Sequence, residues 1–233
     1  QTADIDLTVG GDWVPLVAGA PGFTGTYDGG SHTISNMTTA TGASNRGLFA
    51  KSDGATITYL SLTDVTVAGD DTLGALVAQP ADTIIADIAV TGQVTGGVTT
   101  GGVVGFASEG TRLTRVSFNG TVTGDGNTGG IAAVLDYAEA TDIQVTGTTV
   151  TGTTDAGGLA GSAGNSTIAR VSVTATVDGT NYVGGIAGEI SETPLSEATS
   201  TVDITATDSV GGLVGYNNAS TISQSSASGT IEG

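Results

Sequence analysis

The sequence lacks cysteine and has few basic residues. Without cysteine, the chain can form neither a disulfide framework nor a thiolate zinc site. Only 5 lysine and arginine residues stand against 23 aspartate and glutamate residues, which gives a formal net charge of −18. Nucleic-acid binding needs a basic surface that neutralises phosphates, so we expect no nucleic-acid partner.

Aromatic residues and long apolar runs are also scarce. Aromatic residues make up 4% of the chain, and no apolar run is long enough to predict a membrane-spanning helix. We therefore expect a protein that is not embedded in a membrane. The first residue is Gln1, which fits a mature secreted form or an excised segment. In contrast, 39 glycines and abundant threonine and valine favour strands and turns over helices.

A short glycine motif recurs along the chain, as "NRGLFA", "LGALVA", "TGGVVG", "TGGIAA", "AGGLAG", "VGGIAG" and "VGGLVG". The second glycine-like position is occupied by Gly47, Ala75, Gly102, Gly130, Gly158, Gly185 and Gly212, at intervals of 27 or 28 residues. So constant a period predicts a solenoid, in which each repeat is a coil that buries its apolar face against neighbouring coils.

Each repeat reads as about three short strands joined by Gly, Asn, Asp and Ser corners. The clearest is "TIARVSVTATVDG", residues 167–179, where Val171 and Val173 alternate with Ser172 and Thr174 as in a half-buried strand. Stacking equivalent strands makes parallel sheets. The sequence thus predicts an all-β fold: a right-handed parallel β-helix (β-solenoid) of about seven coils of 27–28 residues with an N-terminal cap.

One column of apolar residues follows the glycines and is predicted to be a core ladder: Leu48, Leu76, Val103, Ile131, Leu159, Ile186 and Leu213. The residue after each of these is also apolar, from Phe49 through Val77 to Val214. If that second stripe points outward, it is an interaction surface, and if it turns inward at a corner, it is core. The sequence leaves both directions open.

Residues 1–40 break the period and contain the single tryptophan, Trp13, and the single histidine, His32. We predict that this segment caps the solenoid, with Trp13, Phe23 and Tyr27 as an apolar lid, and that residues 41–233 form the repeats. The last repeat ends at Gly233 without a comparable cap. Either the chain is one segment of a longer repeat protein, or its uncapped C-terminal coil self-associates end to end.

The segments "TADIDLT", "WVPL", "FTGTYDGGSHTISNM", "RGLFA", "GGLAG" and "GGLVGYN" resemble the GLUG-motif repeat proteins of bacterial and archaeal surfaces. The resemblance covers essentially the whole chain. It implies a right-handed β-solenoid that is secreted or at the cell surface, as a segment of a large adhesin. Such repeats are scaffolds, so the motif is specific for architecture and weak for function.

The basic, acidic and histidine residues of this sequence do not form a pattern typical of a catalytic site. The basic residues are Arg46, Lys51, Arg112, Arg115 and Arg170, and the repeat places Arg115 and Arg170 at corresponding positions two coils apart, as surface residues. The adjacent acids Asp70 and Asp71 suit a turn, and His32 suits a packed or capping role. We therefore predict no enzyme activity.

Calcium is a separate question. Two turns, "GDGN" at residues 124–127 and "TTDAG" at residues 153–157, contain oxygen ligands, but neither has calcium-loop spacing. We predict no required cofactor or metal, with adventitious calcium binding compatible with these turns.

Threonine recurs on the outward face of the third strand of each repeat. One predicted column is Thr63, Thr91, Asn119, Thr146, Thr174, Thr205 and Ser228, and the next is Thr66, Gln93, Thr121, Thr148, Thr176, Thr207 and Thr230. Coils spaced about 4.8 Å apart would make these columns a regular array of methyls and hydroxyls. Such an array resembles the threonine faces of ice-binding solenoids, although threonine is also an ordinary outward strand residue.

Three functional hypotheses follow. The first is a non-catalytic extracellular binding or spacer module of a surface adhesin, whose partner is a glycan or a cell-surface protein. The second is an ice-binding (antifreeze) protein that uses the threonine face, and the third is a polysaccharide-active β-helix enzyme. The candidate binding residues common to the first two are Thr63, Thr66, Thr91, Thr121, Thr146, Thr148, Thr174, Thr176, Thr205 and Thr207.

Overall fold

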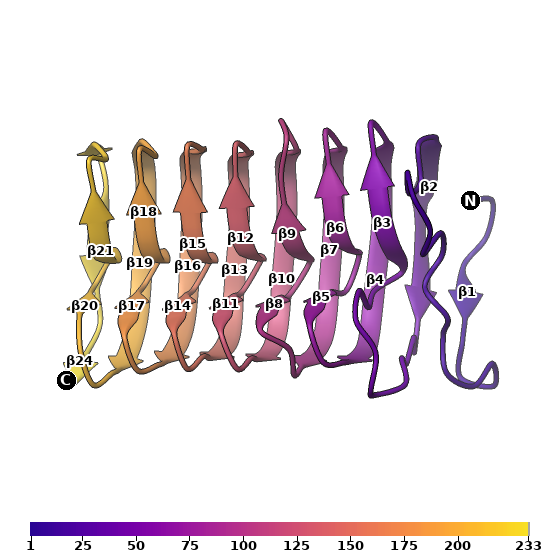
Figure 1. Ribbon diagram of the computed structural model, residues 1–233, viewed down its shortest axis with the longest axis horizontal. Helices are drawn as coiled ribbons and strands as arrows, with labels where there is room; N and C mark the ends of the chain where they lie inside the picture. Colours follow the sequence, from indigo (N-terminus) through magenta and orange to yellow (C-terminus); the bar gives the residue numbers. More distant parts are fainter. Residues whose placement is uncertain (233) are drawn as a thin grey trace.

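The computed structural model describes residues 1–232, and it is a solenoid of stacked coils (Figure 1). Three sheets run along its length, and neighbouring strands in each sheet are parallel. The predicted all-β parallel β-solenoid is confirmed. Within residues 1–232 no element is a helix, so none could be the long apolar helix that crosses a membrane.

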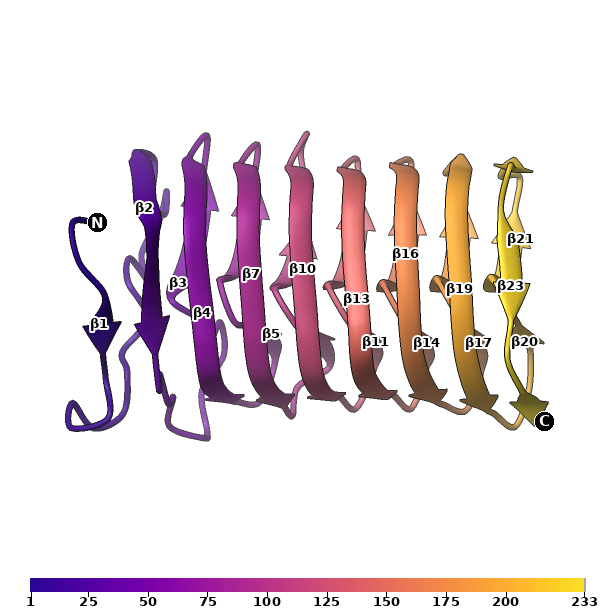
Figure 2. The ribbon, with the colours of Figure 1, turned by 180° about the vertical axis from the view of Figure 1, so that it is seen from behind.

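The long strands of each coil form sheet A, which faces the viewer in Figure 2. Their length lets alternate side chains point into the core over nearly a whole side of the coil. Sheet A consists of β1 (Ile5–Asp6), β2 (Thr26–Ser35), β4 (Thr56–Ala68), β7 (Ile84–Thr95), β10 (Arg112–Thr123), β13 (Glu139–Thr151), β16 (Thr167–Asp178), β19 (Leu195–Thr205), β22 (Ile222–Ser223), β23 (Ser226–Ser228) and β24 (Ile231–Glu232).

Two sheets of shorter strands form the other side of the coils (Figure 1). Sheet B consists of β3 (Phe49–Asp53), β6 (Val77–Ala81), β9 (Val104–Ala107), β12 (Ala132–Asp136), β15 (Ala160–Gly164), β18 (Ala187–Ser191) and β21 (Val214–Asn218). Sheet C consists of β5 (Thr72–Gly74), β8 (Thr99–Gly101), β11 (Asn127–Gly129), β14 (Asp155–Gly157), β17 (Tyr182–Gly184) and β20 (Val210–Gly211).

The solenoid has about eight turns, close to the seven predicted from the glycine motifs. The additional turn begins with β2, which pairs with β4 in sheet A although it precedes the first motif. The N-terminal segment thus contributes a regular strand to the main sheet as well as covering the end of the solenoid.

The predicted ladder forms the centre of the core. Its members from Leu48 to Ile186 are fully buried, and Leu213 in the last coil is half-buried. The stripe that follows it also turns inward at the corner between sheets C and B, because Phe49, Val77 and Val104 are buried as well. The stripe is therefore core and not an exposed interaction surface.

The glycines of the repeat permit close contact between coils at this corner. A Cβ atom on Gly158 would meet the backbone oxygen of Gly185 in the next coil and the side chain of Val173 in the core. This glycine is thus required by space between stacked backbones, and the motif is structural.

The N-terminal aromatic residues pack against the first coil. Phe23 stacks on Phe49 with ring centroids 4.9 Å apart, and Tyr27 meets Phe49 edge-on at 5.7 Å. Trp13 donates a hydrogen bond from Nε1 to the carbonyl oxygen of Leu48 at 3.2 Å. These contacts cover the apolar end of the ladder, as a lid does. At the other end, Ile222 and Ile231 remain 38% and 51% exposed.

Candidate functional site

The outer face of sheet A carries the predicted threonine residues. In β16, Val171, Val173 and Val177 are buried while Ser172 and Thr174 are exposed, so the strand alternates as the sequence predicts. Parallel pairing places equivalent outward residues of successive coils beside one another. Polar columns therefore run along the whole solenoid.

We name the first of these columns column 1. Asn119 pairs with Thr91, Thr146 with Thr174, and Thr201 with both Thr174 and Ser228. Two hydrogen bonds link neighbouring coils along this column: the amide of Asp64, the residue after Thr63, donates to Thr91 Oγ1 at 3.2 Å, and Asn119 Nδ2 donates to the carbonyl oxygen of Thr146 at 2.6 Å. The members of column 1 are Thr63, Thr91, Asn119, Thr146, Thr174, Thr201 and Ser228.

Column 2 lies beside column 1, one pleat further along each strand. Its strand pairs are Thr66 with Gln93, Gln93 with Thr121, Thr121 with Thr149, Thr149 with Thr176, and Thr176 with Asp203. The amide of Thr230 continues it by donating to Asp203 Oδ1 at 3.1 Å. The structure thus brings together seven of the predicted residues in two columns: Thr63, Thr66, Thr91, Thr121, Thr146, Thr174 and Thr176.

The prediction for Thr148 is wrong. Thr148 pairs with Ala175, an inward position, and is 2% exposed, whereas its neighbour Thr149 occupies column 2. The cause is a β-bulge at Gly147, where the register between β13 and β16 shifts by one residue. One extra residue turns every later side chain to the other face, so counting two residues from Thr146 gives the wrong threonine.

The predictions for Thr205 and Thr207 are also wrong. Thr205 pairs with Asp178 at the end of the strand, and Thr207 lies in the turn beyond β19. Thr201 and Asp203 occupy the two columns in this coil. The sequence contained the necessary signal, since Thr201 lies as far after Gly185 as Thr174 lies after Gly158.

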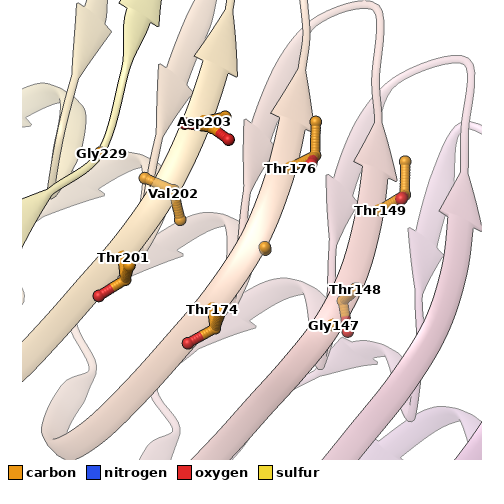
Figure 3. Close-up of a pocket in the computed structure, with 10 residues that line it drawn as sticks. Gly147, Thr148, Thr149, Thr174, Thr176, Thr201, Val202, Asp203 and Gly229 are labelled. Carbon is orange, nitrogen blue, oxygen red and sulfur yellow. The ribbon is translucent and has the colours of Figure 1, made fainter.

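A shallow, open trough of about 360 Å³ lies between the columns, and Figure 3 shows its residues. Thr174 and Thr201 lie on one side, Thr149, Thr176 and Asp203 on the other. Its floor is formed by small or inward residues: Gly147, Thr148, Ala175, Val202 and Gly229. Gly229 has φ of 117°, and a Cβ there would meet the carbonyl oxygen of Val202, so this turn of the backbone requires glycine.

The columns are in register but the face is not uniform. Two threonines separated by one residue occur in β16, as Thr174 and Thr176. Bulges separate Thr63 from Thr66 and Thr146 from Thr149 by an extra residue. Amides and a carboxylate replace threonine at Gln93, Asn119 and Asp203. The face is therefore a hydroxyl-rich trough with irregular steps.

Arg115 and Arg170 hold a surface ladder of ion pairs elsewhere on sheet A. Arg115 donates two hydrogen bonds to Asp87, at 2.7 and 2.8 Å, and Arg170 donates two to Asp142, at 2.7 and 2.9 Å. These guanidinium hydrogen bonds lower the pKa of Asp87 and of Asp142. Both arginines occupy equivalent exposed positions two coils apart, as the repeat predicts.

The other residues considered for catalysis, His32, Asp70 and Asp71, take part in local contacts of the fold. His32 lies 3.2 Å from Asp4 in the N-terminal segment, where Asp4 also accepts a hydrogen bond from the Thr33 amide. Asp70 and Asp71 form the turn before β5, where the Asp71 carbonyl accepts from the Thr99 amide. Neither group faces the trough.

The two turns considered for calcium become neighbours in sheet C. Asn127 starts β11 and Asp155 starts β14, and these strands pair with each other. The fold thus places oxygen-bearing side chains from both turns side by side, which their separation in sequence did not reveal.

Comparison with known proteins supports the architecture. The GLUG motif matches residues 206–232, in the last repeat. A crystal structure of a putative immunoglobulin A1 protease from Bacteroides ovatus is similar in fold, with a TM-score of 0.73 and 17% sequence identity over 96% of this chain and 76% of that chain. No curated protein matches the chain in sequence. Together with the stacked coils, these findings identify the chain as a parallel β-solenoid that carries the GLUG motif.

Proposed function

We propose that the chain is a non-catalytic binding module of a surface adhesin, which holds an extended polar ligand in the trough of sheet A. The observation that carries the proposal is the pair of in-register polar columns on either side of an open depression. Hydroxyl and amide groups repeated about every 4.8 Å offer donors and acceptors to a long ligand such as a glycan chain.

A non-catalytic role is supported by how the acidic side chains are used. Asp203 is the single carboxylate among the residues that line the trough, and it accepts a hydrogen bond from the Thr230 amide. Glycoside hydrolysis needs two carboxylates on either side of the scissile bond. Asp87 and Asp142, in turn, are held by arginines. Binding without bond cleavage is therefore the function that this surface suits.

Secretion or exposure at the cell surface fits this role, with a glycan or a cell-surface protein as the partner. The exposed last coil adds a second contact, because Ile222 and Ile231 present apolar surface beside strand edges. Exposed edges pair readily with other strands. End-to-end association through this coil would multiply the binding sites along one axis.

Replacing Thr149 and Thr176 together by tyrosine tests the trough. Both side chains face outward in column 2, so the rings should fill the trough while the strands keep their pairing. We expect at least about tenfold weaker binding to immobilised polysaccharides, measured by surface plasmon resonance. The matched control is Thr180→Tyr with Thr207→Tyr, which places two rings in exposed turns outside the columns. Equal loss in both variants, or in neither, would contradict the assignment.

Ice is the second candidate ligand, favoured by the adjacent threonines of β13, β16 and β19. Thr146, Thr174 and Thr201 are consecutive members of column 1, and Thr149 and Thr176 lie beside them in column 2. Thermal hysteresis of the native chain and of the same tyrosine variants tests this function directly. Ice shaping that disappears with Thr149→Tyr and Thr176→Tyr would replace the polysaccharide by ice as the ligand of this face.

A further inference from the structure

Sheets B and C lie on the side of the solenoid opposite to sheet A (Figures 1 and 2). Two side-chain pairs connect the outer faces of these two sheets. Asn127 of β11 donates from Nδ2 to Ser162 Oγ of β15 at 3.1 Å, and Tyr182 of β17 stacks on Tyr216 of β21 with ring centroids 4.9 Å apart. In each pair, an outward side chain of sheet C contacts the outward side chain of sheet B in the next coil.

The equivalent positions in the coil between these two pairs are occupied by two carboxylates, Asp155 and Glu189. Asp155 pairs with Tyr182 along sheet C, and Glu189 lies between Ser162 and Tyr216 along sheet B. The repeat geometry therefore sets Asp155 of one coil beside Glu189 of the next. The preceding pair, Asn127 and Ser162, forms a hydrogen bond, and the following pair, Tyr182 and Tyr216, forms an aromatic stack. The pair between them consists of two carboxylates, which repel each other.

Asp155 is also buried without a donor. Its residue is 8% exposed, and among residues 1–232 no hydrogen bond reaches its carboxylate. A carboxylate in a largely buried residue is costly when it has no donor and a second carboxylate stands beside it, so this arrangement calls for a positive group.

The chain supplies no such group at this position. Arg112, Arg115 and Arg170 pair with Glu139, Asp87 and Asp142 on sheet A. Arg46 and Lys51 lie in the first coils, beside and within β3. Within the described part of the chain, no ion pair involves Asp155 or Glu189.

Four neighbouring strands, β11, β14, β15 and β18, each carry an oxygen-bearing side chain at this position. Besides the two carboxylates, Asn127 offers Oδ1, because its Nδ2 is already used for Ser162, and Ser162 offers Oγ. Carboxylate, amide and hydroxyl oxygens in a flexible set suit calcium rather than softer metals. We propose that Asp155 and Glu189, with Asn127 and Ser162, bind one calcium ion that ties successive coils together.

Terbium(III), which substitutes for calcium, gives a direct test. Tyr182 and Tyr216 lie beside the site, so bound terbium should emit when tyrosine is excited. We expect a saturable signal that calcium displaces, and a rise in Tm on adding calcium. Asp155→Asn and Glu189→Gln should each weaken calcium binding at least about tenfold in calorimetry. Asp53→Asn and Asp82→Asn, which remove the same charge from exposed sites in early coils, should leave it unchanged.

Two further variants locate the ion. Tyr182→Phe with Tyr216→Phe should abolish the terbium emission while calorimetric calcium binding persists, because phenylalanine does not sensitise terbium. Persistent emission would overturn the location. Equal weakening in all four acidic variants would show diffuse attraction to the net charge of −18 and would also overturn the proposal. The proposal would also be overturned if the Tm of the native protein did not change on adding calcium but rose on acidification. In that case the carboxyls of Asp155 and Glu189 would share a proton.

Discussion

At the scale of single residues, a local change in the backbone gives two adjacent side chains different surroundings, as the bulge at Gly147 does for Thr148 and Thr149. Thr148 is buried and forms long hydrogen bonds of 3.4 Å to the carbonyl oxygens of Phe118 and Thr146, whereas Thr149 faces the trough. The same holds for carboxylates: Asp142 is an exposed ion-pair member and Asp155 is buried without a donor. Residue type alone therefore predicts neither role.

The raised pKa of Asp155 predicts a distinct pH dependence of stability in metal-free protein. Its carboxyl has a pKa of about 6 in the folded chain against 3.8 in the unfolded chain. Folding therefore favours the protonated form, so this contribution is fully present below pH 3.8 and is lost as pH rises through about 6. In EDTA, Asp155→Asn should raise Tm relative to the native chain above pH 6, and the gain should shrink towards pH 4.

Asp142→Asn is the contrasting control. Hydrogen bonds from Arg170 lower the pKa of Asp142, so its contribution is present above the unfolded value of 3.8 and is lost as pH falls. This variant should therefore be less stable than the native chain at neutral pH and similar to it in acid. Thermal melts from pH 3 to 8 measure the Tm of both variants. The same pH dependence of Tm in Asp155→Asn and Asp142→Asn would contradict both assignments.

At the scale of elements, the long strands tolerate irregular steps as long as pairing resumes in register. In β13 the bulge at Gly147 inserts one residue, yet Thr149 pairs with Thr176 and Val150 with Val177 beyond it. Gly147 has φ of 60°, a conformation that glycine adopts without steric cost. Bulges of this kind give two of the three 28-residue intervals, from Gly47 to Ala75 and from Gly130 to Gly158.

Deleting Gly147 should therefore leave the fold intact. Thr146, Thr148 and Thr149 already pair with Thr174, Ala175 and Thr176, so removal of the bulge gives a regular ladder. We expect an unchanged far-ultraviolet circular dichroism spectrum and a Tm near that of the native chain. Deletion of Ala175 is the matched control. It removes a residue from a strand without a bulge, reverses the faces of its remainder, and should strongly destabilise the protein.

At the scale of the whole molecule, stability is shared between each coil and its neighbours. Central coils are covered on both sides, whereas the last coil contacts one neighbour through β20 to β24. The core ladder reflects this difference, since Leu159 is fully buried and Leu213 is half-buried. A solenoid of this kind should lose its ends before its middle.

Leu159→Ala should cost about 2–5 kcal/mol of unfolding free energy, because it opens a cavity between covered coils. Leu213→Ala removes the same atoms from a half-exposed position and should cost clearly less. Urea denaturation measures both values, and amide hydrogen exchange should show β21 to β24 exchanging before β13 and β16. A larger cost at Leu213 would mean that the last coil is covered in solution, as end-to-end association would do.

The sequence by itself determined the coil, its core ladder and the outward threonine face of sheet A. The reason is that a period of 27 or 28 residues and the alternation of apolar and polar residues are local signals. Tertiary structure alone decided that Thr149 and not Thr148 faces outward, and that the stripe from Phe49 to Val214 is core. It also decided that Asp155 of one coil lies beside Glu189 of the next. These facts depend on bulges, corners and pairing between coils, which bring together residues that sequence spacing does not relate.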